Sequence, residues 1–211
     1  MINHTFSKTR VEAFSDGVFA IIITLLVLEI KVPHVEHHDS VPDLLHSLLG
    51  LTPKLVSWII SFLIVCVIWV NHHRVLESIK AVDNPLLWLN ANLLLWCSFI
   101  PFPTALMGDY VHNPLAVFFF GIVMSFAALG FTFIRMYLKK HPELLQVPPA
   151  PGLHKREVTR SFLFGPVFYW AGASFAWVSP VISLVIYFLI PVYFIFPTPA
   201  RKKPEVAAVD H

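Results

Sequence analysis

Long runs of uncharged, apolar residues are the feature that most restricts the folds open to this chain. Between Lys54 and Arg74, 19 consecutive residues include no Asp, Glu, Lys or Arg. An α-helix of about 20 apolar residues crosses the hydrocarbon core of a bilayer. Runs of about this length occur at residues 13–32, 54–73, 85–107, 114–138, 161–178 and 181–196. The sequence therefore predicts an all-α membrane protein with six transmembrane helices per subunit.

Prolines interrupt three of these runs. Pro101 and Pro103 lie in the third run, Pro166 in the fifth and Pro191 in the sixth. Proline lacks a backbone N–H, so the carbonyl that it frees needs another donor inside a membrane. We expect kinks at these positions, and a gating hinge is the alternative.

The scarcity of charge also excludes other classes of protein. Charged residues make up 13% of the 211 residues, against about 25% in a typical soluble domain. The net charge of +2 offers no basic surface for nucleic acid, so no such partner is expected. Cys66 and Cys97 lack the spacing of a zinc site or a disulfide framework. Phosphate-binding, metalloprotease and serine-hydrolase motifs do not occur, so we expect neither an enzyme nor a cofactor.

The distribution of Lys and Arg predicts the orientation of the helices. If both termini lie in the cytoplasm, that side holds 13 of the 15 basic residues, and only Lys31 and Lys54 lie outside. Loops rich in Lys and Arg remain in the cytoplasm. We therefore predict a multi-pass protein embedded in the lipid bilayer, with a six-helix domain at residues 1–197. Residues 198–211 are expected to form a short, disordered cytoplasmic tail.

A cluster of histidines follows the first run, on the outer side. His34, His37, His38 and His46 lie close in sequence to acidic residues, a composition that suits metal binding. However, no regular ligand spacing repeats among them. We therefore interpret this segment as a solvated loop and predict no metal site.

The uncharged part of the first apolar run is short. Only 12 residues separate Asp16 from Glu29, and a stretch of about 12 residues cannot cross the membrane core. The helix must therefore carry both carboxylates at the membrane boundary, where they are costly unless they face protein, water or a partner. We expect this helix to be the one most enclosed by the others.

One face of this first helix is distinct. At about 100° per residue, a single stripe contains Phe14, Gly17, Ile21, Thr24 and Leu28, with Leu25 at its edge. Thr24 is the only residue with a hydroxyl group in the apolar stretch. Such a stripe can line a water-filled pathway. The alternative is ordinary helix packing, in which Thr24 bonds to its own helix.

Polar residues gather at the cytoplasmic ends of the first two helices. Arg10 and Asp16 are six residues apart, about 240° around a helix, so they cannot form an i,i+4 pair and need other partners. The second run ends at the same depth as Asp16. We predict an inter-helix polar network formed by Arg10, Ser15, Asp16, Trp69, His72 and His73. A proton relay through Asp16 and a histidine is the alternative.

Three short motifs resemble those of a known family. Arg10, Phe14, Ser15 and Asp16 form an R-x-x-x-F-S-D string at the start of the first helix. W-V-N-H-H at residues 69–73 and S-F-I-P-F-P-T at residues 98–104 lie in the second and third helices. In combination these motifs resemble the transmembrane protein 175 family, the endolysosomal-type potassium channels and their bacterial relatives.

The resemblance implies a homotetramer in which the first helix of each subunit lines a central pore. Carried over by offset, the constriction is formed by Ile21, Thr24, Leu25 and Leu28. A narrow apolar constriction gates by dewetting, and it favours potassium because potassium holds its water less tightly than sodium. The implied function is passive conduction of potassium ions across a bacterial inner membrane.

Acidic residues enter this interpretation in two ways. Glu29 would raise the cation concentration at the outer mouth of the pore. The alternative function is a proton-coupled secondary transporter that uses Asp16, His72 and Glu29 as carriers.

Overall fold

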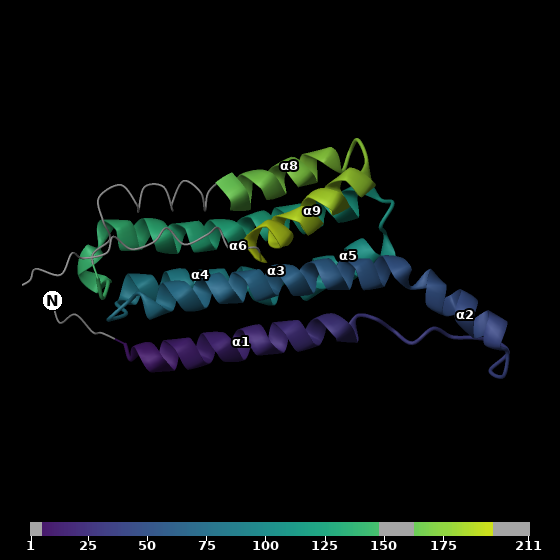
Figure 1. The fold of residues 1–211 in the computed structure, drawn as a ribbon, viewed down its shortest axis with the longest axis horizontal. Helices are drawn as coiled ribbons and strands as arrows, with labels where there is room; N and C mark the ends of the chain where they lie inside the picture. The colour runs from purple at the N-terminus through teal and green to yellow at the C-terminus, as the bar shows by residue number, and fades with distance from the viewer. Residues whose placement is uncertain (1–5, 148–162, 196–211) are drawn as a thin grey trace, which may run out of the picture.

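Helices make up most of the described chain, and most of them run along one axis (Figure 1). The computed structural model describes residues 6–147 and 163–195. Its elements are α1 (Lys8–Leu28), α2 (Val41–Gly50), α3 (Thr52–Glu77), α4 (Asn84–Ser98), α5 (Pro101–Asp109), α6 (Pro114–Lys140), η1 (Pro142–Leu144), η2 (Leu163–Val167), α8 (Phe168–Phe175) and α9 (Pro180–Ile195). Within these residues the only extended pairing is two isolated bridges. The all-α fold class is therefore confirmed.

Polar side chains cap the helices at the membrane boundaries. Asp83 Oδ1 accepts a hydrogen bond from Leu86 N at 3.0 Å at the start of α4. Asn113 Oδ1 accepts from Leu115 N at 2.9 Å at the start of α6, beside Pro114. The first N–H groups of a helix have no partner within the helix, so these caps satisfy donors that would otherwise be unpaired.

Four helical segments are long and apolar enough to span a membrane. They are α1, α3, α6 and the combined segment Asn84–Asp109, which contains α4 and α5. These segments correspond to the first four predicted runs. The sixth run is the apolar helix α9, which has 16 residues. The first residues of the fifth run, 161–162, lie outside the described residues. The predicted tail at 198–211 also lies outside them.

The third span is interrupted directly before Pro101, where α4 ends and α5 begins. Thr104 Oγ1 donates to Ile100 O at 2.8 Å. Because the hydroxyl proton of Thr104 is used in this bond, Ser61 Oγ must be the donor in the 2.7 Å bond between Ser61 Oγ and Thr104 Oγ1. These hydroxyls satisfy a carbonyl beside the interruption and fasten α5 to α3. The helix is thus interrupted next to Pro101, one of the positions where a kink was expected, whereas α9 is continuous through Pro191.

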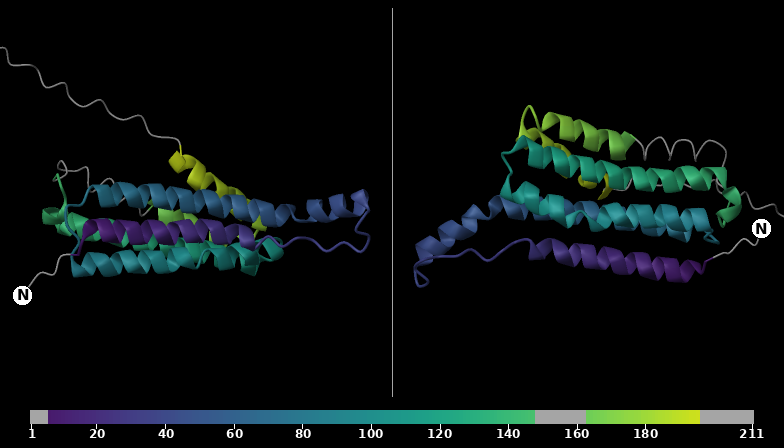
Figure 2. Two further views of the ribbon diagram at one scale, coloured as in Figure 1. Left: turned by 90° about the horizontal axis from the view of Figure 1, so that it is seen from below. Right: turned by 180° about the vertical axis from the view of Figure 1, so that it is seen from behind.

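The first helix lies at one edge of the subunit, opposite α8 (Figure 1). Seen from below, α1 lies between α3 and the α4–α5 segment and packs against both (Figure 2). In its spanning window 28% of the residues are buried, against 56% for α6. The expectation that the first helix is the most enclosed is therefore wrong within a single chain. The most buried span is α6, because it packs against α4, α5, α8 and α9.

The segment after α1 contains a helix that the sequence did not predict. In α2, Ser40 accepts a hydrogen bond from Asp43 N at 3.4 Å as the N-cap, and His46 lies within the helix. The interpretation of the whole segment as a loop is therefore wrong. None of the residues of α2 is buried. Within the described residues, no three His, Cys, Asp or Glu side chains gather as a metal site would require.

Candidate functional site

The two faces of α1 have opposite environments. Val11, Ser15, Phe19, Ile22 and Leu26 are buried against α3 and the α4–α5 segment. On the other face Phe14, Ile21 and Leu28 are 65%, 59% and 61% exposed, and Gly17, Thr24 and Leu25 are exposed as well. The stripe predicted from the sequence is therefore the face that the rest of the chain leaves uncovered.

Thr24 presents its oxygen on this free face. Its hydroxyl lies 3.1 Å from Ala20 O and 2.9 Å from Ile21 O, so it donates its proton back to its own helix. This is the local bond expected of a single threonine in an apolar helix. Because the proton is used, the lone pairs of the hydroxyl oxygen remain available on the exposed side. Such an oxygen can accept a hydrogen bond from water or contact a cation.

The two acidic residues of α1 lie at different depths. Glu29 follows the last helical residue and is half-buried. Asp16 lies eight residues inside the helix, about 12 Å from its start, and it is exposed. The helix is longer at its N-terminus than the predicted run, which places Asp16 further from the helix end than the sequence suggested.

Asp16 belongs to an exposed group of contacts between α1 and α3. Trp69 Nε1 donates to Asp16 Oδ1 at 2.9 Å. The Trp69 ring stacks on His73, with ring centroids 6.0 Å apart, and His73 Nε2 lies 3.2 Å from Glu77 Oε1. The indole N–H is the single polar group of a tryptophan side chain, so the bond to the Asp16 carboxylate fixes the orientation of the Trp69 ring. The contact holds the N-terminal half of α1 against α3.

A second, buried chain of hydrogen bonds joins three helices. His72 Nε2 lies 2.7 Å from Asn90 Oδ1, and Asn90 Nδ2 donates to Ser15 Oγ at 3.0 Å. Ser15 in turn donates to Val11 O at 2.8 Å. With the amide oxygen as acceptor, the proton of His72 is assigned to Nε2. Its Nδ1 is buried and has no hydrogen-bond partner among the described residues.

The structure thus separates the residues of the predicted network. Asp16, Trp69 and His73 lie in the exposed group, whereas Ser15 and His72 lie in the buried chain. Arg10 is exposed, and its guanidinium forms no hydrogen bond or ion pair with the described residues. Sequence reasoning missed Asn90, the centre of the buried chain. The available signal was an amide side chain within an otherwise apolar run.

Buried polar groups gather at two levels along α3. Ser57 and Ser61, with Thr104 of α5, lie toward the start of α3, and His72, with Asn90 of α4, lies toward its end. On α3, Ser61 and His72 are 11 residues apart, about 16 Å. Between Ser61 and His72 the buried residues of α3 are Ile64 and Val65, so polar side chains of this helix do not join the two groups. Ser125 and Thr132 of α6 are buried as well, and they bond to the carbonyls of Pro166 and Ala128.

The buried chain makes a specific prediction for stability. Asn90→Leu removes the acceptor for His72 and the donor for Ser15, and it leaves buried polar atoms unpaired. We expect the free energy of unfolding to fall by about 2 kcal/mol, measured as thermal unfolding in detergent. Asn92→Leu is the matched control, because Asn92 is half-buried and forms no hydrogen bond with the described residues. Equal melting temperatures for the two variants would contradict this role.

The four apolar spans and the polar contacts between them define an α-helical integral membrane protein. Residues 10–101 match the family described as "Endosomal/lysosomal potassium channel TMEM175". A potassium channel from Chamaesiphon minutus is 38% identical over 189 residues, which cover 88% of this chain and 92% of that protein. The chain belongs to the TMEM175 family, whose members are ion channels and not enzymes.

Two further comparisons agree with this assignment. The crystal structure of a lysosomal potassium-selective channel TMEM175 homolog from Chamaesiphon minutus matches with a TM-score of 0.75 and 33% identity, covering 89% of this chain and 96% of that chain. An endosomal/lysosomal proton channel TMEM175 from Gallus gallus is 28% identical over 201 residues, which are 93% of this chain and 39% of that protein. The resemblance carried by the three motifs is therefore confirmed.

Proposed function

We propose that this chain is the subunit of a homotetrameric potassium channel in the bacterial inner membrane. In this proposal the α1 helices of four subunits surround a central pore and conduct potassium ions passively, without a cofactor. The observation that carries it is the free face of α1, an apolar stripe with one hydroxyl on a helix packed only on its opposite side. A face of this kind must be covered either by lipid or by the same face of other subunits. The family membership favours the other subunits.

The proposed topology has six spans, both termini in the cytoplasm, and a channel domain at residues 1–197. It is supported by where the basic residues of the described helices lie. Lys8, Arg74, Lys139 and Lys140 are in the first turn of α1 and in the last turns of α3 and α6, which share one end of the bundle (Figure 1). Lys31 and Lys54 lie at the other end, after α1 and at the start of α3. The end with more Lys and Arg faces the cytoplasm.

The proposed constriction is built from Ile21, Leu25 and Leu28, with Thr24 between them. Rings of large apolar side chains exclude water when the pore is narrow, so an ion must lose part of its hydration shell. Four Thr24 oxygens can replace part of that shell, because their protons are held by their own helices. Potassium loses water more easily than sodium, and this difference supplies the selectivity. Glu29 at the outer end raises the local cation concentration.

The contacts of Asp16 and His72 support a central pore over a carrier. A proton-coupled transporter using Asp16, His72 and Glu29 would need a polar route that joins these residues. Within the described residues, His72 is buried and bonds to Asn90, whereas Asp16 is exposed and bonds to Trp69. A second candidate is the same pore with protons as the permeant ion, which the name of the Gallus gallus relative favours.

Single-channel recording in planar bilayers tests the proposal. The purified protein is expected to produce unitary current steps that reverse near the potassium equilibrium potential when potassium and sodium gradients oppose each other. Native mass spectrometry of the same sample is expected to give four subunits. Currents that reverse at the proton equilibrium potential would support the proton pore. Slow flux that requires a proton gradient and shows no unitary steps would support the transporter and contradict both channels.

A further inference from the structure

The loop between α3 and α4 connects two distant parts of the chain at the end of the subunit where α1 begins. Three backbone hydrogen bonds make this connection, from Phe6 N to Val82 O at 2.8 Å, from Lys80 N to Leu144 O at 2.8 Å and from Gln146 N to Ser78 O at 2.9 Å. Phe6 lies two residues before the first residue of α1, whereas Leu144 and Gln146 follow α6. Residues 78–83 therefore lie between the start of α1 and the segment after α6, and they are bonded to both.

Asp83 adds a side-chain contact to this connection. One carboxylate oxygen caps α4 through Leu86 N, and the other accepts a hydrogen bond from Tyr137 OH at 2.5 Å. Asp83 directly follows Val82, the residue that holds Phe6. Because both oxygens are engaged, a displacement of Tyr137 on α6 acts on the loop and on the backbone that holds the start of α1.

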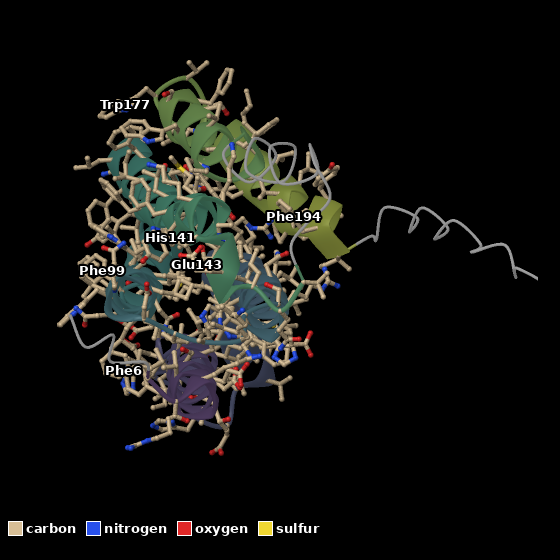
Figure 3. All side chains as sticks on the ribbon, turned by 90° about the vertical axis from the view of Figure 1, so that its left-hand side faces the viewer. Phe6, Phe99, His141, Glu143, Trp177 and Phe194 are labelled. Carbon is tan, nitrogen blue, oxygen red and sulfur yellow. The ribbon has the colours of Figure 1, made fainter. Side chains whose placement is uncertain are left out.

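Tyr137 is in turn in contact with His141. Their rings are stacked with centroids 4.3 Å apart, and His141 Nδ1 lies 2.8 Å from Glu143 Oε1. Figure 3 looks onto this end of the subunit and shows His141 and Glu143 close together, with Phe6 beside α1. The His141 side chain is 39% exposed, so it exchanges protons with the surrounding solution.

The charge state of this pair depends on pH. A hydrogen bond from its own backbone N–H and the bond with His141 lower the pKa of Glu143, so this carboxylate remains ionised as the pH falls below neutrality. When His141 carries a proton, its contact with the ionised Glu143 is an ion pair. When His141 is neutral, the contact is a single hydrogen bond.

We propose that His141 is a cytoplasmic pH sensor that acts on the pore helix α1 through Tyr137, Asp83 and the α3–α4 loop. A protonated His141 is held both by Glu143 and by the ring face of Tyr137. This fixes Tyr137 against Asp83 and the loop against Phe6. Loss of the proton weakens both contacts and releases the start of α1. The effect on current rests on the proposed channel function, whereas the movement of the N-terminal segment does not.

Other charged groups surround this cluster and α1. Lys80 lies close enough to Glu143 to favour its ionised form, and Lys139 and Lys140 precede His141 in the chain. Near the start of α1, Lys8 Nζ lies 3.6 Å from Glu12 Oε1, and His73 pairs with Glu77. Among these neighbours, His73 is the other histidine. It is therefore the rival sensor that an experiment must separate.

Spin labels across the Phe6–Val82 bridge test the movement directly. Residues facing each other in an antiparallel bridge have Cα atoms about 5 Å apart. We would attach nitroxides to the F6C/V82C variant of the full-length protein, with Cys66 and Cys97 replaced by Ala, in lipid vesicles. Dipolar broadening is expected at pH of about 5.5 and is expected to weaken by about 7.5. His141→Gln keeps a hydrogen-bond donor but cannot be protonated, so its broadening is expected not to change with pH.

Two further variants define the route. Tyr137→Phe keeps the ring but loses the bond to Asp83, so the pH response of the labels is expected to disappear. His112→Gln changes an exposed histidine at the other end of the bundle and is expected to respond like the parent protein. In bilayers the potassium current of the parent is expected to change about threefold with cytoplasmic pH over the same range, and that of His141→Gln is expected to remain constant.

Each outcome bears on the sensor. A label signal that does not change with pH in the parent, or that still changes in His141→Gln, overturns it. Loss of the response in His73→Gln with a normal response in His141→Gln also overturns it. A label response that depends on His141 in a protein without potassium current supports the sensor and contradicts the proposed function. A potassium current in a protein whose label signal does not change with pH supports the proposed function and contradicts the sensor.

Discussion

Ile21→Asn is expected to raise the unitary potassium conductance about tenfold, which corresponds to about 1.4 kcal/mol of barrier. Ile21 lies on the free face of α1 and is 59% exposed within the chain. In a tetramer four amide side chains would replace four apolar ones at the narrowest part of the pore. They would hydrate the constriction and remove part of the dewetting barrier. Discrimination between potassium and sodium is expected to fall for the same reason.

The matched control for this substitution is Val27→Asn on the same helix. Val27 is also exposed, but it lies about 120° around the helix from Ile21, outside the stripe. It is expected to leave the unitary conductance close to that of the parent protein. Single-channel recordings in bilayers, with potassium and then sodium as the main cation, measure both properties. Unchanged conductance and selectivity in Ile21, Thr24 and Leu28 variants would remove α1 from the pore.

Gly121→Ala is expected to lower the free energy of unfolding by about 3 kcal/mol. A Cβ atom at Gly121 on α6 would overlap the hydroxyl of Tyr187 and lie 2.9 Å from the Cβ of Ala173. Tyr187 on α9 is fully buried, and its hydroxyl donates to Val117 O at 3.0 Å. The ring therefore has no room to move away. The added methyl group must push α6, α8 and α9 apart.

A double-mutant cycle identifies the source of this strain. Tyr187→Phe removes the atom that the new methyl group would overlap, so Gly121→Ala is expected to cost less in the Tyr187→Phe background than in the parent. Gly50→Ala is the control, because nothing lies within 4 Å of a Cβ atom at that position. Thermal unfolding in detergent measures the four proteins of the cycle and the control. Additive changes in the cycle would show that the contact between Gly121 and Tyr187 is not the cause.

The free face of α1 illustrates how much of the site a sequence can predict. The periodicity of Phe14, Gly17, Ile21, Thr24 and Leu28 places them on one side of a helix wherever that helix is packed. All five lie on the exposed face in the structure. The back-bond of Thr24 was equally predictable, because it depends on atoms within one turn.

The buried chain shows where such prediction ends. Ser15 and Asn90 are 75 residues apart in the chain, and nothing in either local pattern points to the other. Trp69 and Asp16 are 53 residues apart; they could be assigned to one group only because both were expected at the same depth of the membrane. Asn90 had no such marker, since a single amide in an apolar run fits many packing arrangements.

By itself the sequence determined that this protein lies in a membrane, where its four long apolar spans run, and which face of α1 is distinct. These properties depend on composition and on the helical repeat, and both are local. Only the tertiary structure decided that α6 is the most buried helix, that α1 lies at an edge, and that Asn90 joins His72 to Ser15. Those features depend on which apolar faces meet, and many pairings of such faces are nearly equal in hydrophobic energy.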